Sequence, residues 1–437
     1  MRVNKFLVFF LLILFVVISG FIFVLNTDYG KNIIKEYIEI KIHKYMPGVR
    51  ITYIDYGLKD FSVTLKKGEN IVKIYGDMFP LNAVFEGKLK DVSVLYPELR
   101  GEAEINGNVY KKNGFYLAEG KAFFADGFMN FSVKFNKYIE LKGEGEEFDL
   151  QKLFYMTYKD FPYLKGRTAL KILKTPQQSL IKLKSVGVYT KVINTHFESQ
   201  TSITGGLKSG DFVSEIKTDM GKFRLKGKYN DNLFKYVFRA ENVKLNALKP
   251  LLIFPFKCEV SFKGDYEPEN KTIKFKGKDF EGYMNKKINI TFKTTSQRFF
   301  NCIGVKKLFD GKIFGNIKIN NQKGDFNIVC EKVKFLKNIL IARIYRQTGI
   351  DITKQNINKM FIKGEFDNKR VLLDILGSMK NFSFNVKKGV WEYAKKLNMI
   401  LYMRKNGVFY KILISGNKVK LLKQRKVRKT DNTILVY

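Results

Sequence analysis

From Val49 onward, most of this chain alternates apolar and polar residues with a period of two. The alternation is clearest in five segments, Cys258–Val260–Phe262, Ile288–Ile290–Phe292, Ile317–Ile319, Phe382–Phe384–Val386 and Tyr410–Ile412–Ile414. Because successive side chains of a strand point to opposite faces, this pattern predicts strands with one apolar face and one polar face. The sequence therefore predicts a mainly β fold, and the close succession of the strands favours a largely antiparallel sheet.

Glycine, rather than proline, interrupts these segments: the chain has 34 Gly and 8 Pro. An apolar–Lys–Gly triplet recurs at Leu141–Gly143, Leu164–Gly166, Leu225–Gly227, Phe262–Gly264, Phe275–Gly277 and Ile362–Gly364. Glycine within a strand marks a bulge, a bend or a close approach of two backbones. Because repeated bends let a sheet curve, we expect an elongated, curled sheet with an apolar groove and short helical inserts. For any single triplet, an ordinary hairpin turn is the alternative.

An uninterrupted apolar run precedes the strands. Phe6 to Leu25 contains 20 residues without a charge, and a helix of that length spans ~30 Å, the thickness of the hydrocarbon core of a membrane. Arg2 and Lys5 precede the run, so we expect residues 1–5 to form a cytoplasmic leader and 6–25 a retained anchor. The alternative is a cleaved signal peptide, whose apolar run is usually shorter, at ~7–15 residues, and ends in a small-residue cleavage site.

The remainder divides into four regions. Residues 26–48 read as a linker with a helix over 33–46, 49–332 as a repeating β body, 333–416 as a C-terminal β region with a helix, and 417–437 as a basic tail. The apolar pattern that begins at Phe148 recurs at Val243 and Val333, so the spacings are 243 − 148 = 95 and 333 − 243 = 90 residues. We interpret these segments as quasi-repeats, each with a short helix between strands.

Charge and motifs argue against several classes of function. The formal net charge is +38, but Lys supplies 66 of the 79 basic residues, whereas specific phosphate and base contacts favour Arg, so we expect no nucleic-acid partner. We find no nucleophile elbow, phosphate-binding loop or zinc-protease motif, and the two histidines, His43 and His196, lie far apart. We therefore expect no catalysis, metal or cofactor. The three cysteines can form at most one disulfide.

A succession of short strand and glycine motifs lies near the carboxyl end: Phe361-x-x-Gly364-x-Phe366, Phe382-x-Phe384-x-Val386, Gly389-Val390-Trp391, Leu397-x-Met399-x-Leu401 and Ile412-x-Ile414-x-Gly416. This succession resembles that of the AsmA-like family, which includes relatives of TamB. This resemblance implies a single-pass protein of the bacterial inner membrane with most of its chain in the periplasm. It further implies a rolled β-groove that moves phospholipid toward the outer membrane or maintains that membrane.

An apolar groove can shield acyl chains without any specific motif, because burial of apolar surface is not directional. Our candidates for the groove lining lie on the apolar faces of the predicted strands: Val260, Phe262, Ile288, Ile290, Phe292, Ile317, Ile319, Phe382 and Phe384. The predicted partners are the membrane, phospholipid and an outer-membrane or periplasmic protein. Anionic lipid is also a candidate contact of the basic tail, at Lys423, Arg425, Lys426, Arg428 and Lys429. The alternative function is a non-catalytic scaffold or assembly factor for envelope proteins that carries no lipid.

Overall fold

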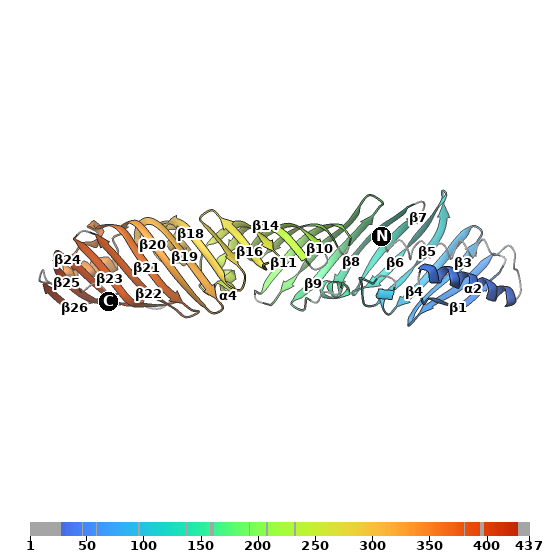
Figure 1. The fold of residues 1–437 in the computed structure, drawn as a ribbon, viewed down its shortest axis with the longest axis horizontal. Coiled ribbons are helices and arrows are strands. Elements are labelled where there is room, and N and C mark those ends of the chain that lie inside the picture. Colours follow the sequence, from blue (N-terminus) through green and yellow to red (C-terminus); the bar gives the residue numbers. More distant parts are fainter. Residues whose placement is uncertain are drawn as a thin grey trace. The chain divides into compact units, whose positions relative to one another are not determined.

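The computed structural model describes residues 28–426, except 46, 58, 95–96, 136–137, 158–160, 192, 207–208, 231–232, 380 and 394–396. The structure is mainly β, as predicted, and all the strand pairs given below are antiparallel (Figure 1). Contacts divide the chain into two compact units. The first unit comprises Met1–Asp219 and Leu225–Leu233, and the second comprises Met220–Arg224 and Phe234–Tyr437. The predicted division between residues 332 and 333 falls inside a strand of the second unit.

The first unit begins with helix α2 (Asp28–Tyr45) and continues as an antiparallel sheet in which each strand pairs with the next. Its strands are β1 (Arg50–Tyr56), β2 (Asp60–Lys67), β3 (Asn70–Met78), β4 (Leu81–Leu89), β5 (Ala103–Lys112), β6 (Phe115–Phe124), β7 (Gly127–Phe135), β8 (Ile139–Asp149), β9 (Leu164–Lys174), β10 (Ser179–Tyr189), β11 (Thr195–Gly205) and β12 (Ser209–Thr218). The short helices are η1 (Val92–Val94) and α3 (Leu150–Met156). The residues of β13 (Gly221–Asn230) are shared between the two units.

The second unit follows the same plan of sequential antiparallel pairing. Its strands are β14 (Leu233–Lys244), β15 (Glu259–Glu267), β16 (Thr272–Gly277), β17 (Phe280–Met284), β18 (Ile288–Thr295), β19 (Phe309–Asn320), β20 (Lys323–Phe335), β21 (Asn356–Phe366), β22 (Arg370–Met379), β23 (Phe382–Glu392), β24 (Leu397–Lys405), β25 (Val408–Ser415) and β26 (Lys418–Lys426). The helices are η2 (Leu245–Leu248), α4 (Lys249–Leu252), α5 (Ser296–Ile303), α6 (Ile339–Thr348) and η3 (Ile352–Lys354). All five segments of strongest alternation fall in strands, except for Cys258, which lies just before β15.

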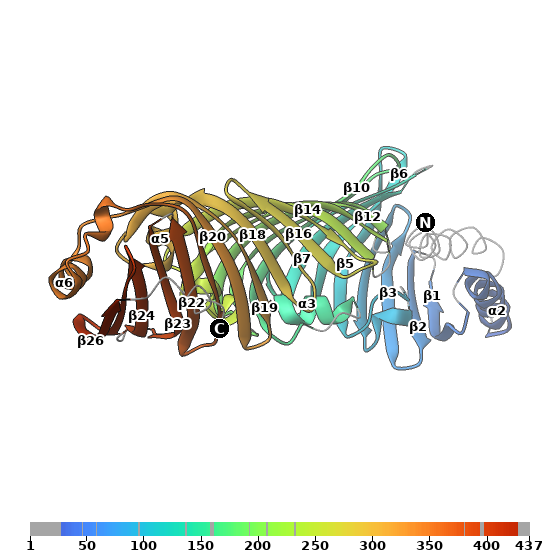
Figure 2. The same ribbon diagram turned by 60° about the vertical axis from the view of Figure 1, so that its left-hand side comes forward.

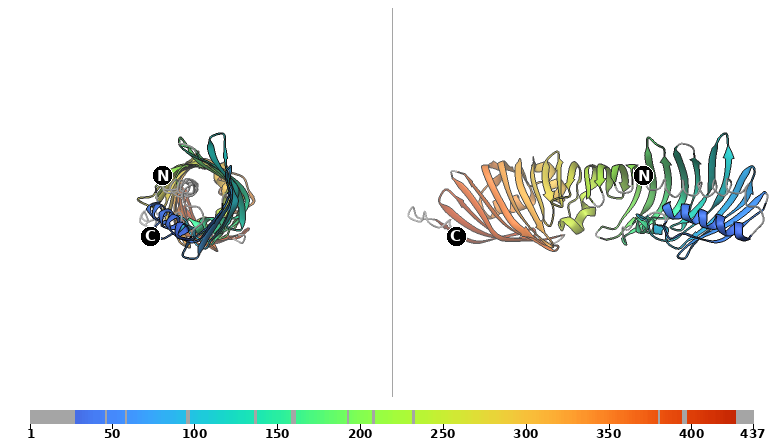
Figure 3. Two further views of the ribbon diagram at one scale, coloured as in Figure 1. Left: turned by 90° about the vertical axis from the view of Figure 1, so that its right-hand side faces the viewer. Right: turned by 45° about the vertical axis from the view of Figure 1, so that its right-hand side comes forward.

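Helix α2 covers the first strands of the first unit, which confirms a helix in the predicted linker (Figures 2 and 3). Ile34, Ile38 and Ile42 recur at helical spacing, are buried, and join a core with the apolar face of β1 to β4. The Glu39 carboxylate accepts a hydrogen bond of 2.8 Å from the backbone N–H of Ile51 on β1. The helix is therefore fixed to the sheet both by apolar packing and by a polar contact.

The long repeat found in the sequence corresponds to a recurring bulge. The backbone φ angle is positive at three residues: it is 64° at Glu147, 53° at Asn242 and 53° at Lys332. The residue that follows each of them, at positions 148, 243 and 333, is 0% exposed. The α3, η2–α4 and α6 segments then follow, respectively. The bulge turns one apolar side chain into the core before the chain leaves the sheet.

The recurring glycines lead us to expect a curled sheet, but the sheet is not strongly curled. Many strand glycines instead lie across from a phenylalanine of the neighbouring strand, and the ring occupies the space above the glycine. The pairs are Phe85–Gly107, Phe197–Gly187, Phe238–Gly264, Phe275–Gly282, Phe292–Gly315, Phe326–Gly364 and Phe384–Gly377. Aromatic rings that rescue glycine in this way fill the apolar face without requiring the backbone to bend.

No helix in the described part of the chain combines the length and the apolar character needed to cross a membrane. The predicted anchor, with its end residues Phe6 and Leu25, lies outside the described residues, as do Arg428 and Lys429 of the predicted tail. The other tail residues, Lys423, Arg425 and Lys426, are exposed on β26. The region predicted as a basic tail therefore begins with a strand, which pairs with β25.

Candidate functional site

The second unit contains an apolar pocket with a volume of about 990 Å³. Strands β19 to β25 supply much of its lining. Other lining residues come from the segment after α4, from α5 and the segment that follows it, from α6 and η3, and from the start of β26 with the turn before it. The lining includes Phe254, Phe299, Phe300, Phe309, Phe326, Phe335, Phe366, Phe384, Trp391, Ile317, Ile328, Ile362, Leu373, Ile375, Met399, Leu401 and Met403. A space of this size and composition suits a largely apolar ligand.

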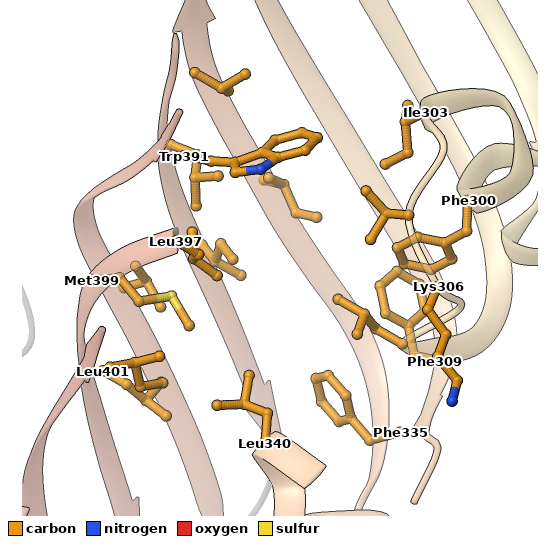
Figure 4. Close-up of a pocket in the computed structure, with 18 of the residues that line it drawn as sticks. Phe300, Ile303, Lys306, Phe309, Phe335, Leu340, Trp391, Leu397, Met399 and Leu401 are labelled. Atoms are coloured by element: carbon orange, nitrogen blue, oxygen red, sulfur yellow. The ribbon is translucent and has the colours of Figure 1, made fainter. Parts of the chain in front are cut away.

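Two walls of the pocket face one another (Figure 4). Trp391, Leu397 and Met399 project from β23 and β24, and Phe300 and Phe309 project from α5 and β19 on the opposite side. Helix α5 and strand β19 therefore form the second wall together.

A disulfide joins two of the inserts. Cys258, just before β15, is bonded to Cys302 of α5 across 44 residues of sequence, which agrees with our limit of one disulfide. The backbone N–H of Lys257 also donates to the carbonyl of Cys302 at 2.7 Å. These bonds hold α5 beside the segment that carries Phe254, whose ring centroid lies 5.3 Å from that of Tyr393. The aromatic cluster at this end of the pocket is thus fixed by covalent and backbone contacts.

Helix α6 bounds another part of the pocket. Its N-cap is Asn338, whose side chain accepts from the N–H of Ile341, and its C-cap is Gly349 in the left-handed conformation. Its buried face belongs to the core of the second unit, as expected for a helix that caps a core. Arg343 donates to the backbone carbonyl of Asn417, so the helix also contacts the turn between β25 and β26 (Figure 2).

The charges at the pocket have one sign. Lys306 and Lys418 are the charged residues of the lining, and it contains no Asp or Glu. Both lysines are exposed, and neither takes part in an ion pair given for the described residues. Asn338, Ser415 and Asn417 are the other polar side chains of the lining. A ligand with a long apolar portion and an anionic or polar head fits this distribution of side chains.

The nucleophilic side chain in the pocket is inert at neutral pH. Cys330 on β20 is completely buried, and burial raises the pKa of its thiol to about 12. Because the thiolate is the reactive form, the thiol stays protonated and unreactive. In the described part of the chain, no group of three or more His, Cys, Asp or Glu residues could hold a metal ion.

The predicted groove residues are not brought into one site. Ile317 and Phe384 line the pocket, whereas Phe382 and Ile319 are buried in the cores of the second unit. Phe292 packs beside α5, with its ring 5.9 Å from that of Phe299. The remaining candidates, Val260, Phe262, Ile288 and Ile290, are half-buried on β15 and β18. The ring of Phe262 lies about 6 Å from those of Phe238, Phe275 and Phe280.

Reasoning from strand periodicity missed the contribution of α5. Phe299, Phe300 and Ile303 line the pocket, but their spacing does not match the alternation of a strand. The adjacent pair Phe299–Phe300 and the sequence Phe254-Pro255-Phe256 were the available signals. Neither signal indicates that both segments face the same sheet, because that depends on long-range packing. Comparisons with family models, with curated proteins and with solved structures found no match for this chain.

Proposed function

We propose that this protein is a non-catalytic phospholipid carrier, anchored in the bacterial inner membrane with the bulk of its chain in the periplasm. Its work in this proposal is to shield acyl chains during passage toward the outer membrane or during maintenance of that membrane. The observation that carries the proposal is the pocket of about 990 Å³, lined by aromatic and aliphatic side chains from strands and helical inserts. Each acyl CH₂ removed from water contributes about 0.8 kcal/mol, so this lining favours a long chain.

The charges at the pocket support a lipid rather than a purely apolar molecule. Lys306 and Lys418 can attract the phosphate of a headgroup while the acyl chains contact the aromatic walls. An exposed lysine near an anionic lipid contributes about 1 kcal/mol. The same two residues place the headgroup at the margin of the pocket and leave the apolar portion of the ligand inside.

The disulfide supports the proposed compartment. Disulfides persist in oxidising environments such as the periplasm and are rare in the cytosol. Cys258–Cys302 therefore agrees with a chain whose bulk lies beyond the inner membrane. The resemblance to the AsmA-like family, which rests on sequence motifs, and the apolar run from Phe6 to Leu25 support the same location.

Lipid extraction and mass spectrometry of the purified full chain test the proposal. We expect phospholipid in a defined ratio to protein after extensive detergent exchange. A photo-crosslinking residue at Phe384, inside the pocket, should capture lipid, whereas one at exposed Lys263 should capture little. The absence of bound lipid, together with equal labelling at the two positions, would reject lipid carriage.

The alternative function, a scaffold for envelope proteins, is favoured by one feature of the first unit. There, Ile34, Ile38 and Ile42 of α2 occupy the apolar face of the first strands, so acyl chains cannot contact that face.

Small-angle X-ray scattering tests the predicted elongated body, since a compact globule of 437 residues has a radius of gyration near ~22 Å. A scaffold would bind its protein partner equally well after all lipid is removed.

A further inference from the structure

Helix α2 has two apolar faces, and the sheet covers only one of them. Ile34, Ile38 and Ile42 point into the core of the first unit. Ile33, Tyr37 and Ile40 recur at positions i, i+4 and i+7 and form a second stripe, with exposed fractions of 44%, 49% and 68%. A soluble surface helix normally places polar residues on the face opposite its core. The second stripe, which exposed Glu36 and Lys44 border, is therefore a candidate docking face.

The surroundings of this stripe resemble the polar border of a membrane-surface helix. Lys41 is exposed, and its Nζ lies 5.5 Å from the centroid of the Tyr37 ring. A tyrosine with an apolar body and a polar tip, beside a lysine, suits the interface between acyl chains and headgroups. Interfacial helices combine such an apolar stripe with flanking lysines.

The position of α2 in the chain indicates which surface is within reach. The apolar run ends at Leu25, and α2 begins at Asp28. Three residues span at most ~11 Å even when fully extended. If the run from Phe6 to Leu25 is in the bilayer, the start of α2 must lie close to the headgroups.

We infer that α2 lies on the outer surface of the membrane that holds the anchor, with Ile33, Tyr37 and Ile40 in the headgroup region. In this arrangement its buried face binds the sheet and its second face binds lipid, so the helix fixes the first unit against the bilayer. The inference depends on the predicted anchor and is independent of lipid carriage by the pocket. Two other occupants of the stripe compete with the membrane: a second copy of this chain, and the apolar run itself folded back on α2.

Tryptophan quenching by brominated lipid tests the inference in the full chain. Trp391 is the one tryptophan of the sequence, so Trp391→Phe provides a dark background. Ile40→Trp then reports on the stripe, and Asn32→Trp, at an exposed position about 80° around the helix, is the matched control. Both replaced side chains are exposed, so neither change should prevent folding.

In vesicles of phosphatidylcholine and phosphatidylglycerol, we expect brominated lipid to quench Ile40→Trp at least threefold more strongly than Asn32→Trp. Equal quenching at the two positions would reject the inference. Emission from Ile40→Trp that is blue-shifted but unquenched would also reject it, because protein would then cover the stripe. Loss of the full chain from the vesicles on alkaline washing would reject it together with the anchor. None of these outcomes depends on whether the pocket holds lipid.

Discussion

The ring of Phe292 on β18 lies over Gly315, its cross-strand partner on β19. A Cβ atom at position 315 would lie 2.6 Å from Cζ of Phe292 and 2.9 Å from the backbone carbonyl oxygen of Asn327. Contacts this short would force the ring or the backbone at Asn327 to shift, so the site favours glycine. The same pairing of a ring with a glycine recurs in both units.

We expect Gly315→Ala to destabilise the protein by ~1–3 kcal/mol, the usual cost of overpacking a core. Urea unfolding followed by circular dichroism measures the change. Gly206→Ala is the control, because the nearest atom to its added Cβ is 4.0 Å away. Gly315→Ala should lower the free energy of unfolding less in a Phe292→Leu background than in the wild type. Strictly additive costs would mean that the ring does not determine the need for glycine.

A charge placed in the pocket should reduce lipid loading. Leu373 lines the pocket, and Leu376 on the same strand, β22, is 49% exposed. We expect Leu373→Arg to lower the amount of copurifying phospholipid at least fivefold, because an arginine in an apolar pocket competes with acyl chains for the space and brings a charge that must remain hydrated. Leu376→Arg, the same change on the other face, should retain normal lipid content. Equal lipid loss in the two variants would indicate an effect on folding rather than on the pocket.

The buried thiol of Cys330 should make stability depend on alkaline pH. Burial raises its pKa from 9.0 to about 12, so the folded protein keeps the proton that the unfolded chain loses above pH 9. The contribution of the protonated thiol to the free energy of unfolding is complete below pH 9. It is lost as the pH rises toward 12, by no more than about 1.4 kcal/mol per pH unit. The difference in unfolding free energy between the wild type and Cys330→Ala should therefore shrink from pH 8 to pH 10. A constant difference would contradict an elevated pKa.

Thiol counting checks the cysteine assignment separately. Without reductant, the denatured protein should react with one equivalent of a thiol reagent, at Cys330, and the native protein with none. After reduction and denaturation, all three cysteines should react. Replacing both Cys258 and Cys302 by serine should lower stability by ~2–4 kcal/mol, the typical contribution of a disulfide. Three reactive thiols in unreduced, denatured protein that was expressed in an oxidising compartment would show that the bond does not form.

Local patterns in the sequence indicated the most regular strands, the helix in the linker and the helix of the C-terminal region, but not α5. The alternation around Ile290 and Ile412 indicated strands, because strand side chains alternate between faces whatever the rest of the chain does. The helix expected within residues 333–416 corresponds to α6 (Ile339–Thr348). The repeat that begins at Phe148, Val243 and Val333 was also visible, since it reflects a local bulge followed by a helix.

Only the tertiary structure decided what the glycines do and where the pocket lies. A glycine in a strand allows either a bend or a covering ring, and the choice at Gly315 depends on the register that places Phe292 opposite it. The pocket likewise requires α5 and the segment of Phe254 to pack beside strands distant in sequence. Period-two alternation reports which face of a strand is apolar, but it carries no information about what covers that face. Long-range packing determines the cover, and for this reason only Ile317 and Phe384 of the predicted lining reached the pocket.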